Sequence, residues 1–220
     1  MYYYRVIKIK GIFKINTFLC DSISAIILAA GYSSRMGEFK PLLPIGGKTA
    51  IMHIIENLSL AGITDIKVVN GYKANLLASF LQQQPVQLVH NPNYHLGMYS
   101  SIQVGVASLD LACKAFLLLP VDYPLVETNT FKDLISYYHK NPSGIIYPTF
   151  REKRGHPPLI STRYREEILS GDQPHGLKGL LNLHNDEALH IPVADQAILM
   201  DMDKNEDYQR LVRYYKTQET

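Results

Sequence analysis

One stretch near the start of this chain constrains its fold more than any other. Residues 25–30 form a short apolar run whose length and β-branched content are typical of a buried parallel strand. Gly31 ends the run, and a small polar loop with two cations, Arg35 and Lys40, follows it. Open α/β sheets bind their ligands at loops that leave the carboxyl ends of parallel strands. We therefore expect an α/β protein with a ligand loop at residues 31–40.

The residue types of this loop indicate an anion. Glycine lets backbone N–H groups approach an anion closely, and Arg35 and Lys40 add full positive charge. The loop is therefore predicted to hold a polyphosphate, although an ordinary strand-to-helix connection with surface charges remains the alternative. Two common phosphate loops are excluded. Leu42 stands where a Walker loop needs glycine, and Ser33 and Met36 replace the second and third glycines of the dinucleotide fingerprint.

The periodicity of the remaining chain predicts alternating strands and helices. At 220 residues, one domain with a sizeable core is expected. The fold class predicted is α/β, a single-domain, doubly wound, mostly parallel sheet with right-handed crossovers. Strands are expected at residues 65–70, 86–89, 115–119, 145–148, 188–193 and 197–202, with a charged turn at 149–154. Helices are expected from about 51 to 62, at 74–84, from an N-cap at Ser100 to about 109, at 131–139 and at 206–218.

Composition narrows the function classes. A net charge of +2 gives no bulk case for nucleic-acid binding, and no stretch of about 18 apolar residues is present to span a membrane. Cys20 and Cys113 form neither a C-x-x-C pair nor a metal-ligand spacing. They are expected to be buried free thiols in a reducing cytoplasm.

Residues 1–22 are a separate N-terminal extension ahead of a main domain at 23–215. Four basic residues interrupt the apolar ones too often for a signal-peptide core. Residues 4–9 are compatible with an extra edge strand, and the whole segment with a disordered tail or an upstream start codon. A basic arm that touches a membrane is a further alternative.

Asp122 follows the apolar strand expected at 115–119. A carboxylate at the carboxyl end of a central strand lies at the ligand-binding edge of the sheet. Taken alone, an Asp followed by a Tyr-Pro turn favours a helix cap. Beside a polyphosphate, however, Mg²⁺ needs only one or two protein carboxylates, because phosphate and water supply its other ligands. Asp122 is therefore the main candidate metal ligand.

Residues 28–43 resemble the L-A-A-G-x-S-x-R-M-G-x-x-K-P-L-L signature of the nucleotidyltransferases that include molybdenum cofactor cytidylyltransferase and the guanylyltransferase of the same cofactor. The resemblance implies a Rossmann-like nucleotide-diphospho-sugar transferase fold and a loop that wraps a nucleoside triphosphate. The third residue of the signature, Ala30, is similar to the pyrimidine-using branches, which implies CTP. The matching nucleotide-binding positions are Leu28, Ala29, Ala30, Gly31, Ser33, Arg35 and Lys40, with Arg35 and Lys40 on the phosphates.

Later segments extend the resemblance to about residue 208. Residues 91–105 resemble a segment that lies against the base, which implies contacts from Gly97, Met98 and Ser101, whereas His95 is expected to be exposed. The string around Asp122 resembles the family's metal-binding motif, which implies Mg²⁺. Residues 155–157, G-H-P, resemble a hallmark of the cytidylyltransferase branch. They place His156 near the active site, as an orienting group rather than a general base, since the acceptor phosphate is already ionised.

The last part of the chain resembles the family less closely. Residues 201–208 resemble D-I-D-T-P-E-D-Y, which implies that Asp201 completes the metal site with Asp122. Asp203 projects to the same side of an extended chain and is an alternative ligand. Residues 172–183 resemble a segment for the second substrate, but His175 and Lys178 replace its glycine and arginine. Lysine keeps the charge and loses bidentate phosphate binding.

The function implied is a Mg²⁺-dependent transfer of CMP from CTP to a phosphate-bearing acceptor, with release of pyrophosphate. The resemblance names molybdopterin as the acceptor, and a molybdenum hydroxylase or its chaperone as the protein partner. Arg35, Lys40, Asp122 and His156 are the catalytic candidates. A transferase that acts on a sugar phosphate or another alcohol phosphate is the first alternative. A non-catalytic nucleotide-binding maturation factor for molybdoenzymes is the second.

Overall fold

A mostly parallel sheet forms the centre of the chain. The computed structural model describes residues 7–9, 12–14, 22–171 and 175–218. Within them, an eight-stranded sheet has the order β10-β9-β11-β8-β3-β6-β7, and β12 pairs with β9. Adjacent pairs among β8, β3, β6 and β7 are parallel, as are β9 and β12, which confirms the predicted fold class. The strands are β3 (Ser22–Leu28), β6 (Ile66–Asn70), β7 (Gln87–His90), β8 (Cys113–Pro120), β9 (Ile145–Phe150), β10 (Lys153–Arg154), β11 (Leu159–Ser161) and β12 (Ala188–Pro192).

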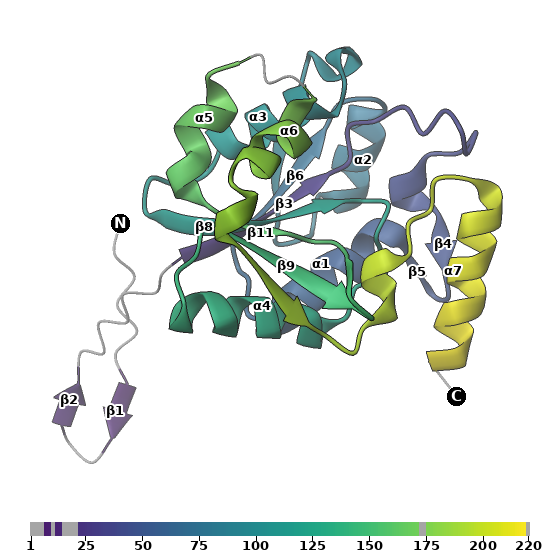
Figure 1. The fold of residues 1–220 in the computed structure, drawn as a ribbon. Coiled ribbons are helices and arrows are strands. Elements are labelled where there is room, and N and C mark those ends of the chain that lie inside the picture. Colours follow the sequence, from purple (N-terminus) through teal and green to yellow (C-terminus); the bar gives the residue numbers. More distant parts are fainter. Residues whose placement is uncertain (1–6, 10–11, 15–21, 172–174, 219–220) are drawn as a thin grey trace.

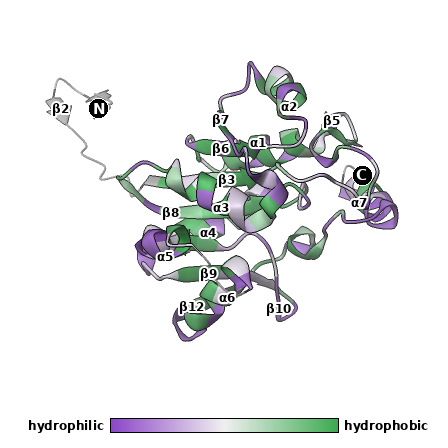
Figure 2. Ribbon diagram, turned by 90° about the horizontal axis from the view of Figure 1, so that it is seen from above, coloured by the Kyte–Doolittle hydropathy of each residue, from purple (hydrophilic) through white to green (hydrophobic). Residues whose placement is uncertain are grey.

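Helices cover both faces of this sheet (Figure 1). Successive residues of β3 point to opposite faces, so Ala25 and Ile27 enter one core while Ile26 and Leu28 enter the other. The strands are largely apolar, whereas α5 and α7 carry polar outer surfaces (Figure 2). The first core receives α1 (Ala50–Leu60), α2 (Ala74–Leu81) and α4 (Thr128–Lys140), and the second receives α3 (Met98–Ala107), α5 (Arg165–Leu169) and α6 (Gly176–Leu183).

β10 and β11 run against the other strands of the sheet, and β11 matters for the site. β11 lies between β8 and β9 and is antiparallel to both. Leu159 at the start of β11 pairs with Leu117, and the carbonyl of Pro158 accepts a hydrogen bond from Leu118 N at 3.1 Å. The residues just before β11 therefore lie at the edge where β3 and β8 end. This reversal brings the G-H-P segment to that edge.

The strand predicted at residues 197–202 is wrong. Residues Gln196–Leu199 instead form a 3-10 helix, η5, because the Asp195 carboxylate accepts a hydrogen bond from Ala197 N at 2.8 Å and starts a turn. Met200 and Met202 are buried beside Leu211 of the C-terminal helix α7 (Asn205–Gln218). The alternating apolar residues thus reflect burial beneath α7 and not a pleated strand.

Two smaller expectations are also corrected. Ser100 is not the N-cap of α3, because that helix begins at Met98 after Gly97, and the Ser100 hydroxyl donates to the Gly97 carbonyl at 2.8 Å. The charged turn predicted at 149–154 is shorter than expected. β9 continues to Phe150, and only residues 151 and 152, both with positive φ, separate it from β10.

Two short hairpins lie outside the central sheet. Ile7–Ile9 (β1) pairs with Ile12–Lys14 (β2), and the other residues of the N-terminal segment up to 21, Cys20 included, lie outside the described residues. Pro44–Ile45 (β4) pairs with Lys48–Thr49 (β5), a hairpin that the sequence did not predict. Cys113 is a buried free thiol. Across the described ranges, the helices are too short or too polar to cross a bilayer.

Replacing Gly105 with alanine is expected to destabilise the protein by up to about 2 kcal/mol. Gly105 packs α3 against the sheet, and a Cβ there would lie 2.7 Å from Ile26 Cγ2 and 3.1 Å from Val69 Cγ2. Overpacking of about 1–3 kcal/mol should outweigh the gain of about 1 kcal/mol in helix propensity. Urea unfolding measures the difference. Gly47→Ala is the control, since no atom would contact its new Cβ, and equal stability of both variants would contradict the packing argument.

Candidate active site

A cavity of about 550 Å³ opens where β3 and β8 end. Three segments distant in sequence form its wall: the loop after β3, the start of α3 and the residues after β8. Asp122 belongs to the wall, and exposed His95 also contributes to it. Every residue predicted to bind nucleotide lines this one cavity: Leu28, Ala29, Ala30, Gly31, Ser33, Arg35, Lys40, Gly97, Met98 and Ser101.

The loop after β3 buries one of its two cations and leaves the other exposed. Ser33 has a φ of 56°, its carbonyl accepts hydrogen bonds from Met36 N and Gly37 N, and its hydroxyl accepts one from Lys40 N at 3.2 Å. Lys40 then opens the 3-10 helix η1 (Lys40–Leu42), which carries its side chain inward. The Lys40 side chain is only 9% exposed, whereas that of Arg35 is 72% exposed. The loop therefore presents one buried and one solvated cation to the cavity.

These cations bring two carboxylates together. Lys40 Nζ donates hydrogen bonds to Asp122 Oδ2 and to Asp203 Oδ1, both at 3.0 Å. Arg35 Nη1 donates to Asp203 Oδ2 at 2.8 Å. Asp203 is held in place by its neighbour, since buried Met202 donates its N–H to the Asp122 carbonyl at 3.0 Å. The network thus links the first loop, the end of β8 and the segment before α7.

The two carboxylates differ in their electrostatics. Burial raises the pKa of Asp122 above its usual range, an effect that Lys40 opposes and that the charges of Asp203 and Asp201 reinforce. The hydrogen bond from Lys40 lowers the pKa of Asp203, and Arg35 lowers it further. A half-buried carboxylate beside two others is a place where an additional cation would be stabilised.

The residues present fit a hard divalent cation. The Lys40 ammonium already lies between the carboxylates of Asp122 and Asp203, so this position suits positive charge. Asp201, the predicted partner of Asp122, has no ion pair among the described residues, although its charge acts on Asp122. The described ranges contain no group of three or more His, Cys, Asp or Glu residues arranged to hold a metal. Two carboxylates with phosphate and water oxygens are nevertheless the usual environment of Mg²⁺.

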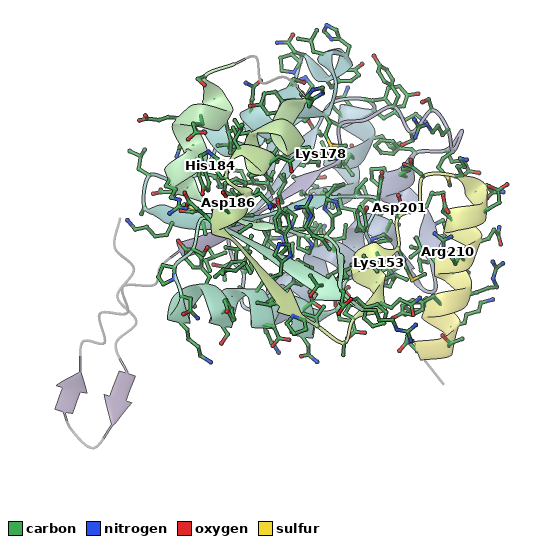
Figure 3. The ribbon with its side chains drawn as sticks, in the orientation of Figure 1. Lys153, Lys178, His184, Asp186, Asp201 and Arg210 are labelled. Atoms are coloured by element: carbon green, nitrogen blue, oxygen red, sulfur yellow. The ribbon has the colours of Figure 1, made fainter. Side chains whose placement is uncertain are left out.

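A second cavity of about 440 Å³ adjoins the first. Leu28, Met98 and Pro120 line both, so the two share a wall. Gly155, His156 and Pro158, which lie just before β11, supply one side of the second cavity, and α6 supplies Lys178 on another (Figure 3). Its polar and aromatic lining residues are Tyr123, Tyr147, Arg154, His156, Lys178 and Asn182.

His156 lies in this second cavity, where burial favours its neutral form. Its ring faces that of Tyr123 with centroids 4.3 Å apart, and its backbone N–H donates to the Ile198 carbonyl at 2.9 Å. Burial lowers the pKa of His156 to about 4, with a smaller effect from Arg154. The buried Nδ1 atom has no hydrogen-bond partner among the described residues. The His156 ring is therefore buried and, within the described part of the chain, unpartnered at Nδ1, and its neutral form is favoured.

Comparison with known proteins identifies the family. Residues 25–189 match the model of the MobA-like NTP transferase domain, which is most of the chain. The chain belongs to this MobA-like family. It is 28% identical over 189 residues to the molybdenum cofactor cytidylyltransferase of Escherichia coli, covering 86% of this chain and 94% of that protein. It is also 28% identical over 154 residues to nicotine blue oxidoreductase of Paenarthrobacter nicotinovorans, covering 67% and 75%.

Solved structures agree with this MobA-like fold. Rv0371c from Mycobacterium tuberculosis superposes with a TM-score of 0.76 at 22% identity and covers 87% of this chain and 98% of its own. A structure of the same protein in complex with manganese has a TM-score of 0.70 at 23% identity, with the same coverage.

Sequence reasoning missed part of the MobA-like site. Tyr123 separates the carboxylates from His156, and burial together with the three nearby aspartates raises its pKa to about 12. Arg154 lies over the Tyr147 ring, 4.3 Å from its centroid. Tyr123 directly follows Asp122 and Arg154 directly precedes the G-H-P segment, so the sequence could have indicated both as site residues. Nothing local indicated Tyr147, which reaches the cavity only because β9 pairs with β11.

Replacing His156 with glutamine is expected to reduce the loss of stability in acid. In the unfolded chain the histidine gains a second ring proton below about pH 6.5, whereas in the folded protein it gains that proton only near pH 4. Stability is therefore lost as pH falls through this window, by about 2 kcal/mol at pH 5 from this residue. Urea unfolding at pH 8 and pH 5 measures the loss for both proteins. Equal losses in wild type and variant would contradict the lowered pKa.

Proposed function

We propose that this MobA-like transferase joins CMP from CTP to the phosphate of a molybdopterin-type acceptor and releases pyrophosphate. The observation that carries the proposal is the pairing of two cavities across a shared wall. One is lined by every predicted nucleotide-binding residue and Asp122, and the other by His156. The relative from Escherichia coli supports the acceptor, and the residues around Ala30 and His156 support CTP.

In the proposed reaction, an oxygen of the acceptor phosphate attacks the α-phosphorus of CTP, and the bond to the pyrophosphate oxygen breaks. Arg35 and Lys40 bind the departing phosphates and stabilise their charge. Asp122 would hold Mg²⁺ together with Asp201 or Asp203. When bound, Mg²⁺ supplies charge neutralisation and orients the two reacting groups. Most of the catalysis then comes from positioning, since no proton must be removed from the acceptor.

The second cavity is proposed to orient the acceptor. Arg154 and Lys178 are cations suited to its phosphate, and the rings of Tyr123 and Tyr147 suit a planar heterocycle. His156 lines the same space and burial favours its neutral form, so it can hydrogen-bond a neutral ring atom. The proposed protein partner is a molybdenum hydroxylase or its chaperone, in the cytoplasm.

Pyrophosphate release tests the proposal. Mg²⁺ and each of CTP, GTP, UTP and ATP are supplied with molybdopterin as the acceptor. Release with CTP alone is expected. Release with another nucleotide would retain the transfer and discard the base assignment, and release only with a sugar phosphate or alcohol phosphate would replace the acceptor. CTP binding without release from any acceptor would favour a binding protein. The absence of both CTP binding and pyrophosphate release would contradict the proposal.

A further inference from the structure

The Asp203 carboxylate forms ion pairs with both cations, Arg35 and Lys40, that are proposed to bind the triphosphate. Asp203 Oδ2 accepts from Arg35 and Asp203 Oδ1 accepts from Lys40, at 2.8 and 3.0 Å. Arg35 lies on a solvated loop, and packing does not force it toward Asp203. The pairing therefore reflects the attraction of the charges themselves. In the protein without ligand, Asp203 is an internal anion at the place proposed for phosphate.

This arrangement makes Asp203 and a free triphosphate competitors. Both are anions for the same two donors, and the backbone keeps Asp203 near them through the Met202 N–H bond to the Asp122 carbonyl. A free triphosphate would have to take Arg35 and Lys40 away from Asp203 and then lie beside an uncompensated carboxylate. Like charges in a partly buried site repel strongly. A triphosphate that carries its own divalent cation avoids this cost, because that cation supplies a new partner for Asp203.

We infer that Asp203 makes this protein selective for the metal-loaded nucleoside triphosphate over the free one. The carboxylate holds Arg35 and Lys40 until a cation that arrives with the phosphates replaces them, and both side chains then turn to the phosphates. Each ion pair that breaks is replaced by another, so the exchange is balanced in charge. The inference rests on the proposed function, since it assumes that phosphates occupy the first cavity.

A simpler interpretation is that Asp203 forms ordinary surface ion pairs, which contribute little to stability or function. The burial of Lys40 argues against it, because its side chain is 9% exposed and its only ion-pair partners among the described residues are Asp122 and Asp203. Once the incoming cation pairs with Asp203, Asp122 is the one carboxylate, of those that the structure describes, that remains paired with Lys40. The surface interpretation predicts no effect of Asp203 on the binding of free triphosphate.

Calorimetry distinguishes the two interpretations. Inorganic tripolyphosphate and CTP are titrated into wild type and D203N, once with EDTA and once with Mg²⁺. Wild type is expected to bind both probes much more weakly in EDTA. D203N is expected to bind them in EDTA at least about tenfold more tightly than wild type, since Arg35 and Lys40 are then free for phosphate. Tripolyphosphate isolates the phosphate contacts from those of the base.

Two further variants separate the pairing from net charge. Glu38 lies on the same loop, between Arg35 and Lys40, and has no ion pair among the described residues, so E38Q removes one negative charge without freeing either cation. Its affinity for the probes in EDTA is expected to stay within about twofold of wild type. D203E keeps the carboxylate and is expected to behave as wild type.

Each result has a defined meaning. Unchanged or weaker binding by D203N in EDTA would overturn the inference, as would an equal gain in E38Q. Wild-type binding in Mg²⁺ together with no gain in D203N would overturn the inference and leave the proposed function standing. No binding of either probe to wild type in Mg²⁺ would overturn both.

Discussion

Asp122→Asn is expected to lower pyrophosphate release about a hundredfold or more, with the fold intact. The carboxylate lies at the end of β8, 3.0 Å from Lys40 and on the wall of the cavity proposed for CTP. Asparagine keeps its size and removes the charge that would hold Mg²⁺. The loss of one charged contact to the reacting phosphates costs about 3 kcal/mol of transition-state stabilisation. Steady-state pyrophosphate release at saturating CTP and Mg²⁺ measures it.

Stability should move in the opposite direction in the same variant. Because burial raises the pKa of Asp122, the folded protein disfavours its ionised form, and a neutral side chain relieves that cost. We expect unfolding of Asp122→Asn to need as much urea as wild type, or more. The control is Asp186→Asn in the exposed 3-10 helix η4 (Asn185–Glu187), which lines neither cavity. Near-normal turnover of Asp122→Asn would contradict the assignment of the site.

Asp195→Ala is expected to lower the free energy of unfolding by about 4 kcal/mol, the largest effect on stability. Asp195 is 2% exposed and accepts three hydrogen bonds at 2.8 Å, from Glu127 N, Thr130 Oγ1 and Ala197 N. Alanine leaves these three donors without an acceptor, and each costs about 1–3 kcal/mol when buried. In a chain of this size the melting temperature should fall by roughly 8–16 °C.

Asp195→Asn tests whether the acceptors are the cause. Its amide oxygen can satisfy part of the donor set, so the loss should be about half that of Asp195→Ala. A loss below about 1 kcal/mol in the alanine variant would contradict the role of the carboxylate. The change should also reach the site, because η5 begins at Asp195 and supplies the Ile198 carbonyl that holds His156 N.

Local patterns were sufficient for the parts of the fold that follow one another along the chain. The apolar run at 25–30 and the helical spacing of Ile51, Ile54, Ile55 and Leu58 depend on nearest neighbours, and both elements were predicted within a few residues. The position of the candidate site followed from the same information. Loops that leave parallel strands meet at one edge, so the residues after β3 and β8 were expected to lie together.

The remaining features depend on contacts between distant residues. Asp203 is separated from Lys40 by 163 positions, and sequence alone predicted neither this contact nor which of Asp201 and Asp203 completes the metal site with Asp122. The apolar alternation at 197–202 was read as a strand, but η5 and the core beneath α7 produce it. The insertion of β11 between β8 and β9 has no local signal, and it alone explains why His156 approaches Tyr123.

The wall shared by the two cavities has a consequence for the end of the reaction. Leu28, Met98 and Pro120 face both spaces, so the dinucleotide made across this wall would fill both at once. A molecule held at two linked places binds more tightly than either half, because the second attachment is intramolecular. We therefore expect departure of the dinucleotide to limit turnover and a rapid burst of pyrophosphate to precede the steady rate. If the proposed reaction occurs there, the new bond would turn two moderate ligands into one bivalent inhibitor, and we expect sustained synthesis to depend on a protein that removes it.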